Sequence, residues 1–258
     1  MIAKGLVAAF WLELVYCVAI LVLISRSRKG LKVPTVYKVP GLEAMDEAIG
    51  RSTEMGRPVF YSPGIGDLQN AQTLASFSTL GYVARQCAKY DTALIVTNRN
   101  SVVYPITEEI VKQAYATEGK PDSFVPDNVR FFSEDQFAYA AACVGVMHRE
   151  RPAASILIGG FWAESLIFAE VGSQVGAIQI AGTANTHQIP FFVAACDYCL
   201  MGEEIYAAGA YLSQDPVLLG ALIGQDWGKM VSVVLIVVGA ILATVSPKAS
   251  WLLTMLKQ

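Results

Sequence analysis

The sequence predicts an α/β protein with a Rossmann-like, mostly parallel sheet, helices on both faces, and flanking N- and C-terminal transmembrane helices. Two observations lead to this prediction. In the middle of the chain, short apolar runs alternate with longer amphipathic runs, as in parallel sheets covered by helices. Near each end lies a long apolar run, and about 20 apolar residues can span a bilayer as a helix.

The first apolar run, "GLVAAFWLELVYCVAILVLIS", covers residues 5–25 and contains a single ionisable side chain, Glu13. It ends in "RSRKGLK" and has no small-residue cleavage site, so it is predicted to be an uncleaved anchor. Ionisable groups inside a membrane usually face protein or water. We therefore expect Glu13 to take part in helix packing, unless it lies shallow enough to snorkel to the interface.

The second run, "MVSVVLIVVGAILATVS", covers residues 230–246 and carries no charge. Trp227 and Lys229 flank it on one side and Lys248 and Trp251 on the other, which is typical of interfacial anchoring. The predicted organisation is an anchor at 1–25, a basic, proline-containing linker at 26–41, an α/β domain at 42–228, and a second transmembrane helix with a short tail at 229–258.

Lysine and arginine residues indicate how the chain is oriented in the membrane. Five basic residues follow the first span within residues 26–38, whereas only Lys4 precedes it. The side richer in Lys and Arg stays in the cytoplasm. We therefore expect a two-pass protein of the cell membrane, with a cytoplasmic central domain and both termini outside.

The overall composition excludes some classes of partner. The chain is 54% hydrophobic and only 16% charged, with a net charge of −3, and it has no basic face of the kind that binds nucleic acid. Its five cysteines are an odd number in a compartment expected to be reducing, which argues against a disulfide framework.

The central domain is expected to alternate strands and helices. Strands are predicted at residues 59–62, 93–97, 129–132, 155–158, 177–181 and 191–195. Helices are predicted at residues 42–55, 70–89, 107–117, 133–149, 161–174 and 197–212. Residues 182–190 have no helical pattern, so either a loop joins the last two strands or one of these strands is an antiparallel edge.

The segment "SPGIGD", residues 62–67, resembles the turn that begins a nucleotide-binding unit. The dinucleotide fingerprint needs a third glycine where Gln69 stands, and the P-loop lysine is missing. Asp67 would also repel a phosphate. We therefore interpret the segment as a tight turn in which Gly64 or Gly66 supplies positive φ and Asp67 or Asn70 caps the helix.

Ligands of parallel sheets bind at the carboxyl ends of the strands, and these ends carry polar side chains here. The expected ligand-binding rim comprises Ser62, Gly64, Gly66, Asp67, Asn98, Arg99, Ser133, Glu134, Gly159, Gly160, Glu164, Thr183, Asn185, His187 and Asp197. A polar, mostly acidic rim suits a cationic or hydroxyl-rich small molecule, or a divalent metal held by oxygens. The same residue types are ordinary helix caps, and "SEDQ" at 133–136 is a capping-box pattern. No metal site and no cofactor is assigned.

The pair Cys196 and Cys199 has C-x-x-C spacing at a predicted strand-to-helix junction. A helix N-terminus can lower a thiol pKa, but the pair lies late in the chain and no second pair or nearby His completes a zinc site. We interpret both as structural cysteines.

Small residues occur in both spans: Gly5, Ala8 and Ala9 in the first, Gly239, Ala240 and Ala243 in the second. Such residues let membrane helices approach closely. Together with the need of Glu13 for a partner, they predict a homo-oligomer or a larger membrane complex.

"GLEAMDEAIGRSTEMGRPVFYSPGIGDL" and "GTANTHQIPFFVAACDYCLMGEEIYAAGAYLS", with the flanking spans, resemble an uncharacterised prokaryotic membrane-protein family, a domain of unknown function. The resemblance covers nearly the whole chain. It implies the architecture and supplies no catalytic residues. Two functions stay open: a membrane-anchored module for ligand sensing or assembly, which the missing motifs favour, and a membrane-bound enzyme acting on a small molecule at the acidic rim.

Overall fold

The computed structural model describes residues 7–28, 40–213 and 216–245. The chain forms two compact units: residues 37–213 make up one, and residues 1–36 with 214–258 make up the other. Most of the linker expected at residues 26–41, namely residues 29–39, lies outside the described residues, as do Gly5, Lys248 and Trp251.

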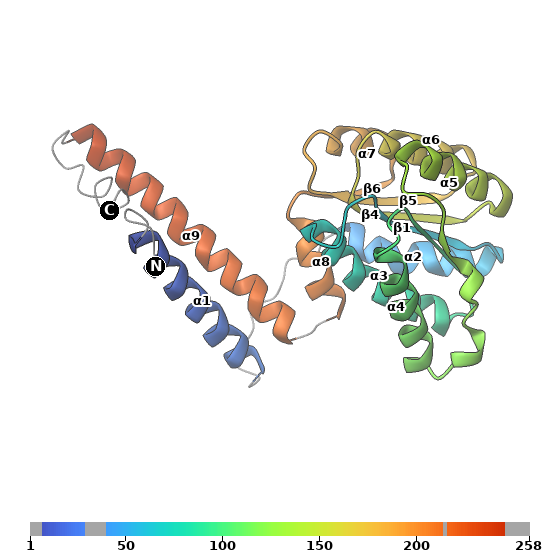
Figure 1. Ribbon diagram of the computed structural model, residues 1–258, viewed down its shortest axis with the longest axis horizontal. Helices are drawn as coiled ribbons and strands as arrows, with labels where there is room; N and C mark the ends of the chain where they lie inside the picture. The colour runs from blue at the N-terminus through green and yellow to red at the C-terminus, as the bar shows by residue number, and fades with distance from the viewer. Residues whose placement is uncertain (1–6, 29–39, 214–215, 246–258) are drawn as a thin grey trace. The chain divides into compact units, whose positions relative to one another are not determined.

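The larger unit contains one sheet of six parallel strands (Figure 1). The strands are β1 (Val59–Gly64), β2 (Leu94–Asn98), β3 (Val129–Phe131), β4 (Ala154–Gly160), β5 (Ile178–Thr183) and β6 (Tyr198–Met201). Their spatial order is β3-β2-β1-β4-β5-β6, the order of the Rossmann dinucleotide-binding folds. Every residue of β1 and β4 is buried, as expected for central parallel strands with both faces covered. The predicted α/β fold is therefore confirmed.

Helices cover both faces of this sheet (Figure 1). One face carries α2 (Pro40–Met55), α3 (Ala71–Lys89), α4 (Val103–Thr117) and α8 (Glu204–Ser213), and the other carries α5 (Gln136–Glu150), α6 (Glu164–Gln174) and α7 (Ile189–Ala195). Two short 3₁₀ turns, Pro121–Ser123 and Pro126–Asn128, precede β3. The chain changes face between β3 and β4, so the switch point of the sheet lies between β1 and β4.

Each face of the sheet has its own hydrophobic core. Tyr61 and Cys87 are fully buried in the core under α2, α3, α4 and α8, and Tyr139 and Cys143 are fully buried in the core under α5, α6 and α7. Burial disfavours the ionised form of these groups. It raises the pKa of Tyr61, Cys87 and Tyr139 above their usual range and that of Cys143 to about 12.

The C-terminal part of the sheet differs from the prediction. Residues 191–195, expected as a strand, belong to helix α7, and the last strand, β6, lies within the segment expected to begin a helix at Asp197. An apolar run as short as "FFVAA" fits a helix as well as a strand, and Pro190 occupies the first turn of α7. The connection between β5 and β6 is thus helical, and β6 is parallel to β5.

Two helix starts are fixed by side-chain caps. Asn70 caps α3, and its side chain accepts a hydrogen bond from Gln72 N; Asn70 was one of the two expected caps. Asp135 caps α5 by accepting from the backbone N–H groups of Phe137 and Ala138. The capping box predicted for Ser133–Gln136 is therefore wrong, because the N-cap is Asp135 and the helix begins two residues later than Ser133 would require.

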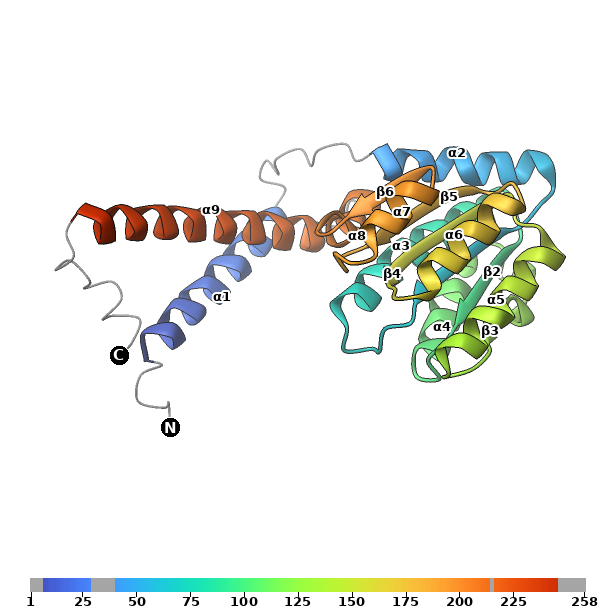
Figure 2. The same cartoon turned by 90° about the horizontal axis from the view of Figure 1, so that it is seen from above.

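The smaller unit is an antiparallel pair of helices, α1 (Val7–Arg28) and α9 (Pro216–Val245). Both contain a stretch long and apolar enough to cross a membrane, Phe10–Arg28 and Leu219–Ile241. The second stretch begins before the predicted residue 230, because α9 continues without a break through Trp227 and Lys229. Figure 2 shows the helices close together along the first half of α9 and separated toward the N-terminal end of α1.

Three glycines spaced four residues apart form the contact surface of α9. A Cβ atom at Gly220 would lie 2.8 Å from Ile24 Cα, one at Gly224 would lie 2.9 Å from Ile20 Cγ1, and one at Gly228 would lie 2.6 Å from the Tyr16 ring. Larger side chains would therefore push α1 away. The small residue Gly239, expected to pack, has no atom within 4 Å of its Cβ position among the described residues.

A substitution at Gly159 tests how closely the ends of β1 and β4 pack against each other. Its φ is +150°, and a Cβ atom there would collide with the carbonyl group of Pro63. We expect Gly159→Ala to lower the free energy of unfolding by about 2–4 kcal/mol through strain and overpacking. Gly50→Ala, inside α2 with open space around it, should raise it by about 0.5–1 kcal/mol. Urea unfolding of the full chain in detergent, followed by circular dichroism, measures both; equal midpoints for the two variants would contradict the expectation.

Candidate ligand site at the carboxyl edge of the sheet

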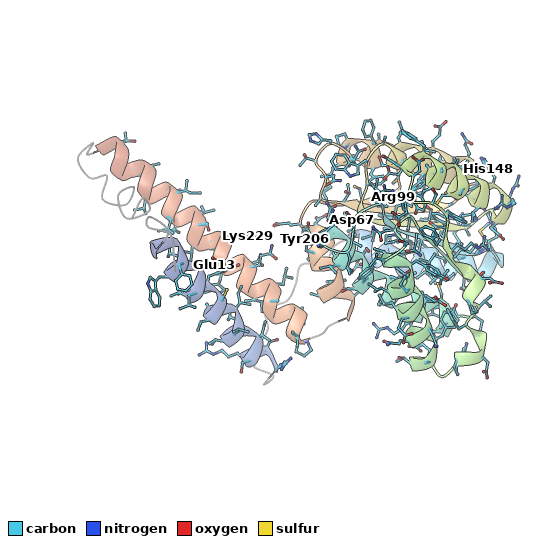
Figure 3. All side chains as sticks on the ribbon, viewed as in Figure 1. Glu13, Asp67, Arg99, His148, Tyr206 and Lys229 are labelled. Atoms are coloured by element: carbon cyan, nitrogen blue, oxygen red, sulfur yellow. The ribbon has the colours of Figure 1, made fainter. Side chains whose placement is uncertain are left out.

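The structure brings most of the predicted rim to one edge of the sheet, and Figure 3 labels two of its members, Asp67 and Arg99. The residues that follow β1, β2, β3, β4 and β5 all lie at the carboxyl ends of these parallel strands. Asp197 does not, because it precedes β6 and accepts a hydrogen bond from Gln179 N near the start of β5, at 2.8 Å. Its expected place on the rim depended on the strand that proved to be α7. Ser62 and Asn98 have fully buried side chains.

The switch point between β1 and β4 is closed by the protein's own backbone. Ile65 N donates to Gly160 O at 2.8 Å, and a Cβ atom at Gly64 would collide with that same carbonyl. Gly64 has φ +82°, so one of the two glycines expected to supply positive φ does so. The two strand ends are in contact where a Rossmann fold usually leaves a crevice for its ligand.

The amide of Gln72 occupies the space beside this closed junction. Its Oε1 accepts from Thr183 Oγ1 at 3.1 Å and from Ala184 N at 2.8 Å, and its Nε2 donates to Asn185 Oδ1 at 2.8 Å. Asn185 in turn donates to Phe161 O at 2.6 Å. Gln72 lies in the first turn of α3, where a dinucleotide-binding protein would hold pyrophosphate. The network ties the ends of β4 and β5 to α3.

On the other side of the switch point, the rim carboxylates bind neighbouring loops. Asn100 Nδ2 donates to Asp67 Oδ1 at 2.8 Å, and the Ser101 hydroxyl donates to Glu134. The hydroxyl and backbone N–H of Ser101 lower the pKa of Glu134. Arg99 donates to Ile65 O at 3.0 Å. These groups hold the loops after β1, β2 and β3 together.

Ser62 contributes to the core instead of to a ligand surface. Its hydroxyl lies 2.8 Å from the Tyr139 hydroxyl, which also lies 3.1 Å from Thr97 Oγ1. All three side chains are fully buried, and burial of a polar group is tolerated when it is hydrogen-bonded. This cluster links β1 and β2 to α5.

Sequence reasoning missed the glutamines of this edge. Gln72, Gln136 and Gln188 each bond a residue at least 23 positions away in sequence. No local pattern marks a glutamine whose partner comes from a distant loop. Within the described residues, no group of three or more His, Cys, Asp or Glu side chains is placed to hold a metal ion.

The cysteine pair lies elsewhere. Cys196 caps the C-terminus of α7, and Cys199 lies in β6, so neither thiol lies at a helix N-terminus, where a thiol pKa can be lowered. Burial raises the pKa of Cys196 to about 12 and that of Cys199 to about 11. Both thiols are therefore protonated at neutral pH, which agrees with their interpretation as structural cysteines.

Thiol alkylation tests this assignment. At pH 8 we expect iodoacetamide to modify Cys196 and Cys199 at least about 100-fold more slowly than an exposed thiol, because the thiolate is the reactive form. A Ser123→Cys variant supplies that reference thiol in the same chain, since Ser123 is exposed. Peptide mass spectrometry gives the three rates, and comparable rates would contradict the raised pKa values.

Comparison with known proteins gives a family and no characterised relative. The sequence matches, over residues 1–253, the family described as a Domain of unknown function (DUF6754). No curated protein and no solved structure among those compared matches the chain. Because the match covers nearly all of the chain, the protein belongs to the DUF6754 family.

Proposed function

We propose that the protein is a two-pass membrane-anchored α/β module that assembles through its helix pair and acts in scaffolding or ligand sensing. The observation that carries this proposal is the environment of Glu13. Within the described residues, no hydrogen bond or ion pair involves Glu13, although it lies on an apolar helix long enough to span a membrane. A carboxylate in such a place calls for a polar partner.

In a second copy of the chain, Lys229 would lie at nearly the same depth in the membrane as Glu13 and would be this polar partner. Tyr16 lies against Gly228 in the antiparallel helix pair. Glu13 is three residues beyond Tyr16, and Lys229 is one residue beyond Gly228 in the same direction. With a rise of 1.5 Å per residue, the two charged residues differ in depth by about 3 Å. Two copies related by an axis along the membrane normal keep equal depths, so Glu13 of one copy can face Lys229 of the other.

Lys229 forms an ion pair within its own helix. Its Nζ lies 3.3 Å from Asp226 Oδ1, and both side chains stay partly exposed. An ion pair within one helix reduces the cost of holding charges in a membrane. Adding the carboxylate of Glu13 from a second copy would surround the ammonium group with acceptors on two sides.

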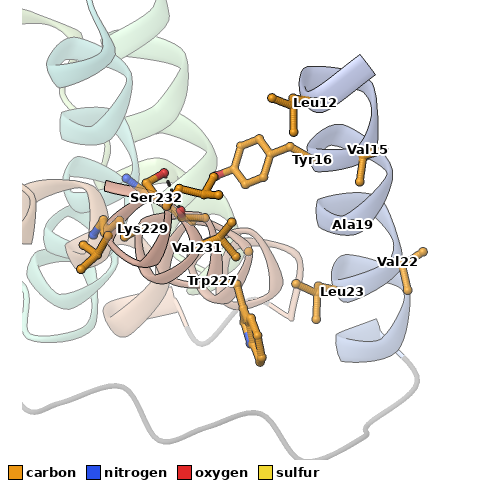
Figure 4. Close-up of a pocket in the computed structure, with 15 residues that line it drawn as sticks. Leu12, Val15, Tyr16, Ala19, Val22, Leu23, Trp227, Lys229, Val231 and Ser232 are labelled. Carbon is orange, nitrogen blue, oxygen red and sulfur yellow. Dashed lines mark hydrogen bonds between the residues drawn. The ribbon is translucent and has the colours of Figure 1, made fainter. Parts of the chain in front are cut away.

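The space between α1 and α9 gives the second copy room to approach. An open pocket of about 950 Å³ lies along the helix pair from Gly224 to Leu235 of α9, lined mainly by apolar side chains such as Leu12, Val15 and Val231 and bordered by Lys229 (Figure 4). Lipid tails satisfy apolar surface as well as protein does, so the charged residues and not this pocket decide the partner.

The rim favours assembly or sensing over catalysis. Asp67 and Glu134, two carboxylates of the expected rim, each accept hydrogen bonds from the neighbouring β2–α4 loop. The switch point is closed by the β1 and β4 backbones. Micromolar binding of ATP or NAD in calorimetry would favour the alternative, an enzyme at this edge.

Assembly is tested by native mass spectrometry after mild detergent extraction. We expect an oligomer for the wild type and a shift toward monomer for Glu13→Leu, because the carboxylate loses its pairing. Glu47→Gln, at an exposed position of α2, is the matched control and should not change the mass. The double variant Glu13→Lys with Lys229→Glu should restore the oligomer. A wild-type protein that is monomeric would refute the proposal.

Topology is tested by labelling intact cells with an impermeant maleimide. The basic residues after α1 predict that the region between the spans is cytoplasmic. Ser123→Cys should therefore react only after lysis, whereas Gln258→Cys should react in intact cells. Labelling at position 123 in intact cells would invert the assigned orientation.

A further inference from the structure

A pocket distinct from the switch point lies over the first turns of α5, α6 and α7. Its volume is about 560 Å³, and its lining consists of Gln136, Trp162, Ala163, Leu166, Gln188 and Phe191. None of these side chains is charged. Trp162 is 54% exposed, Leu166 45% and Phe191 42%, so three large apolar groups face solvent around two amides.

Hydrogen bonds fix how the Gln136 amide faces the pocket. Glu164 is fully buried, and its carboxylate accepts from Trp162 N at 2.8 Å and from Gln136 Nε2 at 2.6 Å. A carboxylate accepts and does not donate, so the nitrogen of Gln136 must face Glu164. Its Oε1 is left as an acceptor for the pocket.

The second amide is oriented in the opposite sense. The Ser165 hydroxyl donates to Gln188 Oε1 at 2.7 Å, which leaves Gln188 Nε2 as a donor. Gln188 is only 9% exposed, and within the described residues no hydrogen bond involves its Nε2 or the Oε1 of Gln136. Neither atom is among the buried side-chain atoms that lack a partner, so both are accessible and can pair with a donor or acceptor of a bound ligand.

We infer that this pocket binds a purine or pyrimidine base, free or as a nucleoside. Nucleobases present neighbouring donors and acceptors on one edge, which matches one free acceptor and one free donor. Their flat faces stack on aromatic side chains, which Trp162 and Phe191 offer. The lining has no Lys or Arg to hold phosphate, and Glu164 behind it disfavours an anion, so the structure selects nucleosides over nucleotides.

This inference is independent of the oligomeric state and gives the proposed module a ligand to sense. The carboxylate of Glu164, predicted as a rim residue, acts here through Gln136 as a positioning group and does not itself reach the pocket, since it is fully buried. Trp162, Gln136 and Gln188 would make the contacts.

The test is isothermal calorimetry of the full chain in detergent with adenosine, uridine and adenosine monophosphate. We expect at least one nucleoside to bind with a Kd of about 10–500 μM, as expected for a small ligand in an open pocket. The monophosphate should bind no more tightly than adenosine. Failure of both nucleosides to bind below about 1 mM, or a monophosphate that binds at least 10-fold more tightly, would overturn the inference.

Substitutions in the pocket show whether the nucleoside binds there. Trp162→Ala should weaken it at least about 10-fold through lost stacking, and Gln188→Leu should do the same by removing the donor. Trp162 is exposed, so its variant stays folded even if the replacement of buried Gln188 does not. Leu74→Ala, which removes a similarly exposed apolar side chain on α3, is the control. Unchanged affinity in Trp162→Ala would refute the site.

Discussion

Two strand ends meet at the centre of the sheet without side chains between them, at Gly64 in β1 and Gly159 in β4. Both have positive φ, and any side chain there would strike the opposite backbone. The hydrogen bond from Ile65 N to Gly160 O follows from this approach. It fixes the distance between the two halves of the sheet, and the Gln72 network and the loop contacts of Asp67 depend on that distance.

The same physical solution recurs in the helix pair, where Gly220, Gly224 and Gly228 let α1 come close. In water a contact of this kind would gain from the hydrophobic effect. In lipid it depends on close packing, because hydrocarbon solvates apolar side chains equally well. Glycines therefore allow close contact in both units: between the backbones of β1 and β4 in the sheet, and between α1 and α9 in the helix pair.

The sequence predicted those parts of the structure that have a local signal. Strands β1, β2 and β4 are fully buried and were found because buried parallel strands are mostly apolar runs, and α1 was found because its apolar run is long. The start of the second long apolar stretch, at Leu219, was missed because Asp226 and Lys229 interrupt the apolar pattern, although they pair with each other. The α7–β6 region was missed because short apolar runs have no distinguishing period.

The candidate site was predicted less well for a different reason. The position of the rim follows from strand direction, so Asp67, Arg99 and Asn185 were found at the expected edge. Which of them faces solvent depends on long-range contacts. Gln72 meets Thr183 across 111 residues of sequence, and Ser62 meets Tyr139 across 77. Amide orientation at Gln136 and Gln188 depends on such contacts too.

The buried phenols and thiols of the two cores have a consequence for alkaline conditions. Burial raises the pKa of Tyr61, Cys87, Tyr139 and Cys143. The folded state therefore keeps four protons that the unfolded chain releases above about pH 8.5 for Cys and about pH 10 for Tyr. Their contribution to stability is fully present below those values and is lost as pH rises, by about 1.4 kcal/mol per group and pH unit. Alkaline pH should thus destabilise the domain through the buried side chains of its two cores.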